Sequence, residues 1–289
     1  MQTYQASCIF DGKATLAEGP GWDEERQAIV WVDIEKGKIS RFYPSTQRNE
    51  TWAVSQKVGC VVRTSEGDLL AGGQEGLLKL NPESGEVTSL QNPEPDLPVN
   101  RFNDGKCDPQ GRLWAGTMSC EEEEGAGSLY RITNEGSVKR MVESVTISNG
   151  LAWSQDGRTM YYIDTPTRHV DAFDFDPVEG EISNRRHVIE IPKDMGYPDG
   201  MTIDAEGKLW VAMCHGGTVL RIDPLSGELL HQVDFPCVET TACAFGGSNL
   251  ERLFVTTGLH KTLKEPDAGK VFVVDGLGVC GVPSFAYGR

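Results

Sequence analysis

Six short segments of the chain recur at regular spacing, and together they have the residue types of a divalent-cation site. Four of them set an acidic or amide side chain beside glycine: Glu18-Gly19, Asn103-Asp104-Gly105, Asn149-Gly150 and Asp199-Gly200. The other two cover residues 57–60 and 240–243. Carboxylate and carboxamide oxygens are the ligands that hard cations prefer, and glycine lets the backbone approach a ligand closely. One such dipeptide would be an ordinary turn, but their recurrence indicates a metal site. None of the six segments contains histidine, which argues against a structural zinc site.

The elements that must position these segments belong to an internal repeat. A short apolar strand occurs six times, at residues 29–33, 69–73, 113–117, 160–164, 209–213 and 253–257. Successive copies start about 40 to 50 residues apart, the length of a four-stranded propeller blade. Glycine-containing turns precede most copies, and the pattern of a third and fourth strand follows. Because long amphipathic helices are absent, the sequence predicts an all-β, six-bladed β-propeller with four-stranded antiparallel blades.

One strand has no blade of its own. Residues 5–10 precede the first repeat, and we expect them to close the ring by pairing with the last blade near residues 271–274. Nothing resembling a linker interrupts the series, so residues 1–289 are predicted to form a single propeller domain. In such a ring the first strand of every blade lines a central channel. The six polar segments should therefore meet at one end of that channel.

Several motifs resemble the family of senescence marker protein, gluconolactonase and luciferin-regenerating enzyme. They are E-G-P-x-W at 18–22, R-F-N-D-G-K at 101–106, L-W-A-G-T-M at 113–118, I-S-N-G-L-A-W at 147–153 and Y-P-D-G-M-T-I-D at 197–204. The likeness continues through residues 245–247 and 276–279 and so covers nearly the whole chain. Each motif alone is weak, whereas the set is specific. The resemblance implies a six-bladed propeller, in agreement with the repeat count.

The resemblance also implies roles for individual residues. Glu18, Asn149 and Asp199 match the positions that hold one divalent ion in the family. Arg101 and Asn103 match positions that contact substrate.

The resemblance specifies the roles of two nearby acidic residues less closely. Glu121 corresponds to a substrate-contacting glutamate of animal members, but it opens an acidic run, 121–127, that is shorter than the animal loop. Asp104 either orients a ligand or only shapes its turn. The loop 258–269 is also shortened, which leaves the substrate preference open.

The activity that the resemblance implies is metal-dependent hydrolysis of aldonolactones such as glucono-δ-lactone. The ion would polarise the lactone carbonyl, and Asp199, both ligand and catalytic base, would activate water. Ca²⁺ is the expected ion, although Zn²⁺, Mn²⁺ and Mg²⁺ also bind oxygen ligands. The expected partner is a small-molecule sugar lactone.

Three alternatives stay open at this point. The same metal could serve an organophosphate or other ester hydrolase, or the chain could be a non-enzymatic calcium-binding regulatory protein. A propeller that serves as a protein-interaction platform would need no such ligand set. Arg101 and Asn103 favour catalysis, and the D-x-D-x-D-G loop of a calcium sensor is absent from the sequence.

Composition restricts the remaining possibilities. The formal net charge is -16, from 43 acidic and 27 basic residues, so nucleic acid and anionic membranes are not expected partners. The N-terminus does not read as a signal peptide, and no apolar stretch approaches the length of a membrane span. Eight scattered cysteines are expected to be reduced thiols in a cytoplasmic protein, a monomer or weak dimer. Of five histidines, only His215, directly after the fifth repeated strand, merits attention.

Overall fold

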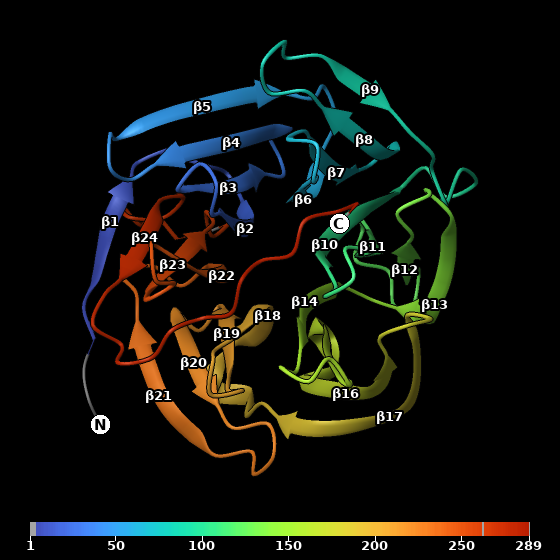
Figure 1. The fold of residues 1–289 in the computed structure, drawn as a ribbon. Helices are drawn as coiled ribbons and strands as arrows, with labels where there is room; N and C mark the ends of the chain where they lie inside the picture. The colour runs from blue at the N-terminus through green and yellow to red at the C-terminus, as the bar shows by residue number, and fades with distance from the viewer. Residues whose placement is uncertain (1–3, 262, 289) are drawn as a thin grey trace.

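The computed structural model, which describes residues 4–261 and 263–288, is a six-bladed β-propeller. Six four-stranded antiparallel sheets stand around a central axis, as Figure 1 shows. The described residues also form two short 3-10 turns, η1 (Thr165–Thr167) and η2 (Lys193–Met195). The predicted fold class and blade count are confirmed. Within the described ranges, no helix has the length and apolar character needed to cross a membrane.

The strands follow one another around the ring in chain order. Blade 1 contains β2 (Ala17–Asp23), β3 (Ala28–Asp33), β4 (Lys38–Tyr43) and β5 (Arg48–Ala53). Blade 2 contains β6 (Val58–Arg63), β7 (Leu69–Gly73), β8 (Gly76–Leu80) and β9 (Val87–Ser89). Blade 3 contains β10 (Asn100–Cys107), β11 (Leu113–Ser119), β12 (Gly127–Ile132) and β13 (Val138–Val145).

The second half of the ring repeats this order. Blade 4 contains β14 (Ser148–Trp153), β15 (Thr159–Asp164), β16 (His169–Asp176) and β17 (Glu181–Glu190). Blade 5 contains β18 (Tyr197–Ile203), β19 (Leu209–Cys214), β20 (Thr218–Ile222) and β21 (Leu229–Asp234). Blade 6 contains β22 (Thr240–Gly246), β23 (Arg252–Thr257), β24 (Val271–Val274) and, from the other end of the chain, β1 (Ala6–Phe10).

The ring is closed by strand pairing between the two ends of the chain. β1 runs antiparallel to β24, with Ala6 opposite Val274 and Cys8 opposite Phe272. Figure 1 shows β1 as the outermost strand of the last blade. This pairing confirms the predicted closure, and it shields the outer edge of β24, which would otherwise expose unpaired backbone groups.

The core lies between neighbouring blades. The repeated apolar strand is the second strand of each blade, and its side chains pack against both adjacent sheets. One buried cluster joins Ile163 of β15 to Val211 of β19, and another joins Val32 of β3 to Ala71 of β7. Burial of these faces is the main driving force that holds the blades together.

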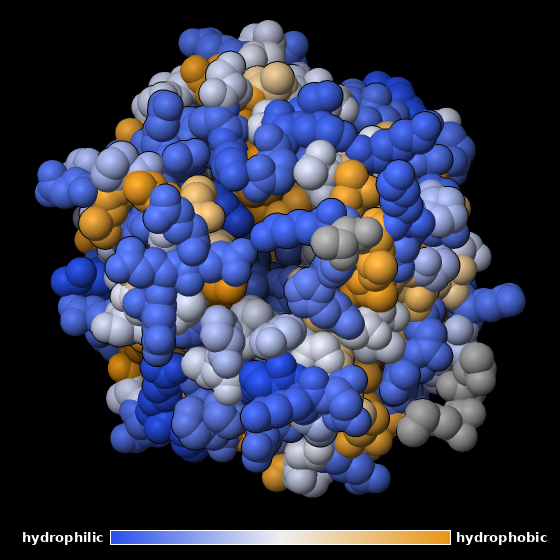
Figure 2. Space-filling view, turned by 180° about the vertical axis from the view of Figure 1, so that it is seen from behind, coloured by the Kyte–Doolittle hydropathy of each residue, from blue (hydrophilic) through white to orange (hydrophobic). Residues whose placement is uncertain are grey.

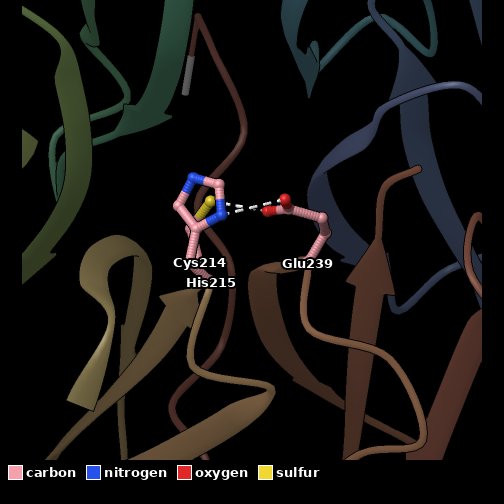
Figure 3. Close-up of side chains that lie close together, drawn as sticks. All are labelled: Cys214, His215 and Glu239. Carbon is pink, nitrogen blue, oxygen red and sulfur yellow. Dashed lines mark hydrogen bonds and ion pairs between the residues drawn. The ribbon is translucent and has the colours of Figure 1, made fainter. Parts of the chain in front are cut away.

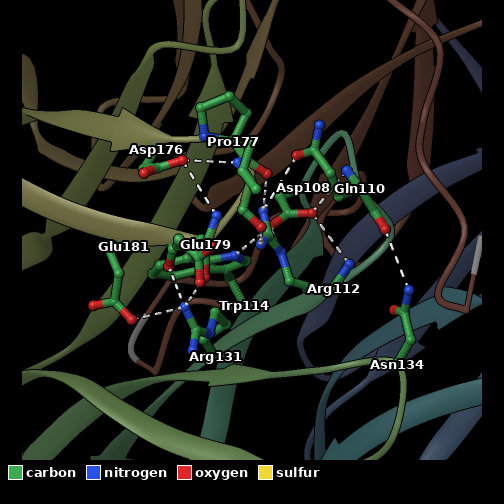
Figure 4. Close-up of polar contacts among 12 residues, drawn as sticks. Asp108, Gln110, Arg112, Trp114, Arg131, Asn134, Asp176, Pro177, Glu179 and Glu181 are labelled. Carbon is green, nitrogen blue, oxygen red and sulfur yellow. Dashed lines mark hydrogen bonds and ion pairs between the residues drawn. The ribbon is translucent and has the colours of Figure 1, made fainter.

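Buried polar side chains link blade 3 to blade 4 (Figure 4). Asp108, which is fully buried, accepts from Trp114 Nε1 at 2.9 Å and from Arg112 Nε at 2.7 Å. The other end of Arg112 donates to the backbone oxygens of Pro177 and Val178 in the next blade, at 2.9 and 3.0 Å. Blade 5 repeats the aspartate–tryptophan–arginine arrangement with Asp204, Trp210 and Arg221.

The C-terminal segment 275–288 closes one end of the channel. It crosses the face seen in Figure 1, where it passes over the turns between the first and second strands of several blades. Backbone hydrogen bonds fix it there, from Ala205 N to Cys280 O and from Ser65 N to Tyr287 O, both 2.8 Å. The blade entrances, where the polar segments lie, are at the opposite end.

Candidate functional site

The inner strands all break their register at the same level of the channel. The shifts lie between Glu18 and Gly21, Val58 and Cys60, Phe102 and Gly105, Asn149 and Leu151, Pro198 and Met201, and Thr240 and Ala242. A β-bulge twists its strand locally and redirects side chains. Six bulges at one level therefore form a ring at the channel end where the blades begin.

Glycine allows neighbouring inner strands to approach closely at this ring. A Cβ atom at Gly59 would lie 2.1 Å from the carbonyl oxygen of Phe102, and one at Gly200 would lie 2.3 Å from the Cβ of Ala242. Neither space admits a side chain. Gly59 and Gly200 thus have a packing role at the ring.

A hydrogen-bond relay orients the amide groups of the ring. Arg101 Nη1 donates to Asn103 Oδ1 at 2.6 Å, and Asn103 Nδ2 donates to Asn149 Oδ1 at 3.1 Å. Asn149 Nδ2 donates to Thr165 Oγ1 at 2.8 Å, and that hydroxyl donates to Pro198 O at 2.8 Å. Because its nitrogen is committed to Thr165, Asn149 keeps its oxygen for the channel side, as a metal ligand requires. The structure thus brings together Arg101, Asn103 and Asn149, as predicted.

Three carboxyl groups are buried within reach of one another's charge. Burial and the negative charge of Asp104 raise the pKa of Glu18 to about 8. Burial, with the charges of Glu18 and then Asp104, raises the pKa of Asp199 well above its usual value. Burial also raises the pKa of Asp104, although Lys106 opposes the shift. Glu18 Oε2 accepts from Gly19 N at 2.9 Å, which leaves its other oxygen for an ion.

This donor set fits a hard divalent cation. Like charges buried together are unfavourable unless a positive charge lies among them. Glu18, Asp199 and Asn149 offer oxygen atoms only, the ligand type of Ca²⁺, Mg²⁺ and Mn²⁺. The three residues that the sequence assigned to the metal therefore meet the chemical requirements for holding one, with Asp104 as an additional buried carboxyl beside them.

Glu121 lies at a different depth from the ring. It is exposed, in the turn that follows β11, and its backbone N–H donates to Ser119 Oγ at 3.1 Å. Its chain neighbour Cys120 interacts with the Arg101 guanidinium, so this turn borders the site on the Arg101 side. A substrate contact from Glu121 stays a prediction.

Two participants were missed by the sequence reasoning. Thr165 lies in η1, outside every recognised motif, and no local pattern signals its contact with Asn149. Lys106 is a partly buried cation below the ring, where its Nζ donates to Leu151 O at 2.9 Å and Met201 O at 2.6 Å. A signal for Lys106 was available, because it ends the R-F-N-D-G-K motif that contains Arg101 and Asn103.

The channel below the ring contains a cavity of about 90 Å³, enough for several water molecules. Its walls are mainly backbone and apolar side chains of the inner strands, with Lys106 and Arg63 as cations. Residues 282–285 of the C-terminal segment form its floor. The opposite face, shown in Figure 2, is largely hydrophilic and hollowed near its centre. A substrate would approach the ring from that face.

The fold and this ring define a class of protein, the six-bladed propellers with buried carboxyl and amide side chains around the channel axis. Residues 16–259 match the family model described as SMP-30/Gluconolactonase/LRE-like region. The chain belongs to this family, as its motifs indicated.

Relatives of known name extend the comparison to both ends of the chain. Regucalcin of Xenopus laevis is 41% identical over 298 residues, which cover 99% of each protein. A solved luciferin-regenerating enzyme is 33% identical with a TM-score of 0.91, and covers 99% of this chain and 100% of its own. A calcium-binding protein of Agrobacterium tumefaciens, named regucalcin, is 28% identical with a TM-score of 0.94 and 99% coverage of both chains.

Proposed function

We propose that this protein is a metal-dependent hydrolase that opens aldonolactones such as glucono-δ-lactone to the aldonic acid. The observation that carries the proposal is the buried ring of Glu18, Asn149 and Asp199, with Arg101 and Asn103 fixed beside it. A protein that only bound an ion would have no use for the arginine. Membership of a family named in part for gluconolactonase supports the same activity.

The bound ion would act as a Lewis acid toward the lactone carbonyl. Ca²⁺ is the proposed ion, because the donor atoms are all oxygen and the Agrobacterium relative is described as calcium-binding. Mg²⁺, Mn²⁺ and Zn²⁺ are also compatible with these ligands.

The side chains of this chain would position the substrate and transfer the proton. Arg101 has its Nη1 committed to Asn103 and to the backbone oxygen of Phe102, so its plane is fixed. The N–H groups that neither these contacts nor Cys120 occupy would donate to sugar oxygens. Asp199 would accept the proton of the attacking water. Burial and the charge of Glu18 raise the pKa of Asp199, which makes its carboxylate a stronger base. Asp199 can combine the roles of ligand and base if one of its oxygens stays free of the ion.

The test is hydrolysis of a panel of aldonolactones, followed with a pH indicator. Wild type and Asp199→Ala are stripped with chelator and refilled with single metals. We expect turnover that requires added metal and falls at least about 100-fold in the variant. Asp234→Ala is the matched control, because it removes an exposed aspartate on the outer strand β21 and should leave turnover unchanged.

Tight metal binding without turnover of any lactone would refute the proposal. Phosphotriesters and simple carboxylic esters belong in the same panel, because the same electrophilic ion could serve an ester hydrolase. If they too were inert, the calcium-binding regulatory alternative would take precedence. The names of the regucalcin relatives are the observation that favours it.

A further inference from the structure

A second cluster of ligand-type side chains lies at the channel mouth, between blades 5 and 6. Cys214 Sγ lies 2.8 Å from Glu239 Oε2, and His215 Nδ1 lies 3.1 Å from Glu239 Oε1. The three donor atoms, sulfur, nitrogen and oxygen, all lie within 4.8 Å of one another. Figure 3 shows the thiol and the imidazole side by side, both directed at the carboxylate.

The backbone holds this cluster in place before any ion arrives. Cys214 ends β19 and forms an antiparallel bridge with Glu239, which directly precedes β22. The carbonyl oxygen of Glu239 also accepts from Gly258 N, at 2.9 Å, in the segment after β23. His215 adopts a left-handed conformation, with φ of 60°, in the tight turn between β19 and β20. The ligands thus come from two blades, and each is fixed by its own strand end.

We propose that Cys214, His215 and Glu239 bind a divalent transition metal such as Zn²⁺, at a site separate from the oxygen-only ring. Thiolate and imidazole are the ligands that Zn²⁺ and Co²⁺ favour and that Ca²⁺ and Mg²⁺ avoid. Three protein ligands leave one tetrahedral position for water or an incoming molecule. Glu18, Asn149 and Asp199 would bind an ion through oxygen alone, so the two sites would differ in their order of preference among ions.

The spacing suits zinc after small side-chain rotations. Zn²⁺ bonds to sulfur, nitrogen and oxygen are about 2.0–2.3 Å long, so tetrahedral ligand atoms lie about 3.3–3.8 Å apart. Sulfur–oxygen and nitrogen–oxygen separations of 2.8 and 3.1 Å are shorter than this, as expected where hydrogen bonds join the atoms. An ion would replace those hydrogens. The Cys214 thiol proton would leave to solvent as the sulfur–metal bond forms, and the His215 hydrogen would move to the half-exposed Nε2 side.

The surroundings of Glu239 favour a cation. Glu239 is buried, and among the described residues its recorded ion-pair partners are the imidazoles of His215 and His260, not lysine or arginine. His260 Nδ1 accepts from Leu263 N at 3.2 Å, so in the neutral ring its hydrogen is on Nε2, which faces Glu239 at 3.7 Å. His260 would therefore support the carboxylate ligand from outside.

Cobalt provides a readout that does not depend on catalysis. The metal-free protein is titrated with Co²⁺, and we expect the near-ultraviolet charge-transfer absorption of a thiolate bound to the ion. Cys214→Ser should abolish this band, and His215→Ala should weaken Co²⁺ binding at the site. Cys280→Ser, which changes an exposed cysteine elsewhere, is the matched control and should keep the band.

Zn²⁺ calorimetry counts the sites. Wild type should bind one Zn²⁺ more than Cys214→Ser. The affinity for that additional ion should fall at least about 100-fold in His215→Ala. Because the His215 side chain is half exposed, its removal should leave the fold intact. Asp199→Ala should lose the ring site and keep the cobalt band.

The proposal fails if Co²⁺ gives no such band, or if the band survives Cys214→Ser. Loss of the band in Asp199→Ala would show a single ion shared with the ring and would also overturn it. Because lactone turnover is not measured, failure of this site and failure of the proposed function remain distinguishable.

Discussion

Individual side chains decide which atom of each ring residue faces the channel. Asn149 illustrates this, because an amide can present either oxygen or nitrogen to the channel. Thr165 accepts from its nitrogen, and Asn103 donates to its oxygen, so both contacts select the orientation that a cation needs. The threonine is thus a positioning residue that acts through Asn149.

Replacing Thr165 by valine tests this role. The substitution keeps the shape of the side chain but removes the acceptor for Asn149 and the donor to Pro198 O. We expect the affinity for Ca²⁺ to fall by about 10- to 100-fold, as is typical when the partner of a metal ligand is lost. Calorimetric titration of the chelator-treated protein measures it.

Thr167→Val is the matched control in the same 3-10 turn. Its hydroxyl bonds to Asp164 O, away from the ring, so the Ca²⁺ affinity should stay within about twofold of wild type. Equal affinities in both variants would remove Thr165 from the site.

Sequence reasoning at this scale found the residues whose motifs are local and missed the contacts between residues far apart in the chain. Glu18, Asn149 and Asp199 each sit beside glycine in a recognisable segment, and the structure brings them to one level of the channel. Thr165 comes from the end of a neighbouring strand, 16 residues after Asn149 in the chain, and a lone threonine carries no signature. Cys214 and Glu239 likewise meet only because two blades pack side by side.

At the scale of the strand, apolar patterning was sufficient to predict the blades. The repeated second strand is buried on both faces, and its period and turns specified six copies. The β-bulges of the inner strands were not predicted, because an extra residue shifts the pairing without changing the hydrophobic pattern. Since the bulges place the ring residues, the depth of the site in the channel required the structure.

The aspartate–tryptophan–arginine arrangement should stabilise the strands that contain it. Asp108→Asn would keep the side-chain size but remove the charge that pairs with Arg112, which stays buried with one fewer ionic partner. Loss of a buried charge partner costs about 3–5 kcal/mol. We expect the free energy of unfolding in urea to fall by an amount in that range.

The equivalent turn of blade 4 supplies the control for this measurement. Asp156 lies in an exposed turn, where it accepts from Ser154 Oγ and Arg158 N. Asp156→Asn should change the unfolding free energy by about 0.5 kcal/mol or less. If both variants had the same stability, the buried arrangement would contribute no more than a surface turn does.

At the scale of the whole molecule, closure of the six-bladed propeller depends on pairing between the two ends of the chain. The last blade has three strands from the C-terminal part of the chain and one from the N-terminal part. Closure makes the six blades mutually dependent, since each inner strand contributes to one channel and each interface buries apolar side chains of two blades. The proposed metal ligands Glu18, Asn149 and Asp199 come from blades 1, 4 and 5, so their relative positions depend on closure of the propeller.

Deleting residues 1–10 should destabilise the last blade, where the two ends of the chain pair. The deletion removes the pairing of β1 with β24 and the partly buried Ile9 and Phe10, which pack against the cluster that contains Trp31. Each half-buried side chain and each strand hydrogen bond contributes about 1 kcal/mol, so we expect the free energy of unfolding to fall by on the order of 3–5 kcal/mol. The affinity for Ca²⁺ should fall with it, because Glu18 lies in β2 of blade 1, which packs beside the last blade.

A peptide that spans residues 4–11, added in trans, separates closure from general damage. If β1 acts by completing the last blade, the peptide should restore both the urea midpoint and the Ca²⁺ affinity in a concentration-dependent manner. A scrambled peptide of the same composition should restore neither. An unchanged midpoint after the deletion would show that blades 1 and 6 hold together by face-to-face packing alone, and the fourth strand would then serve only to cover the edge of β24.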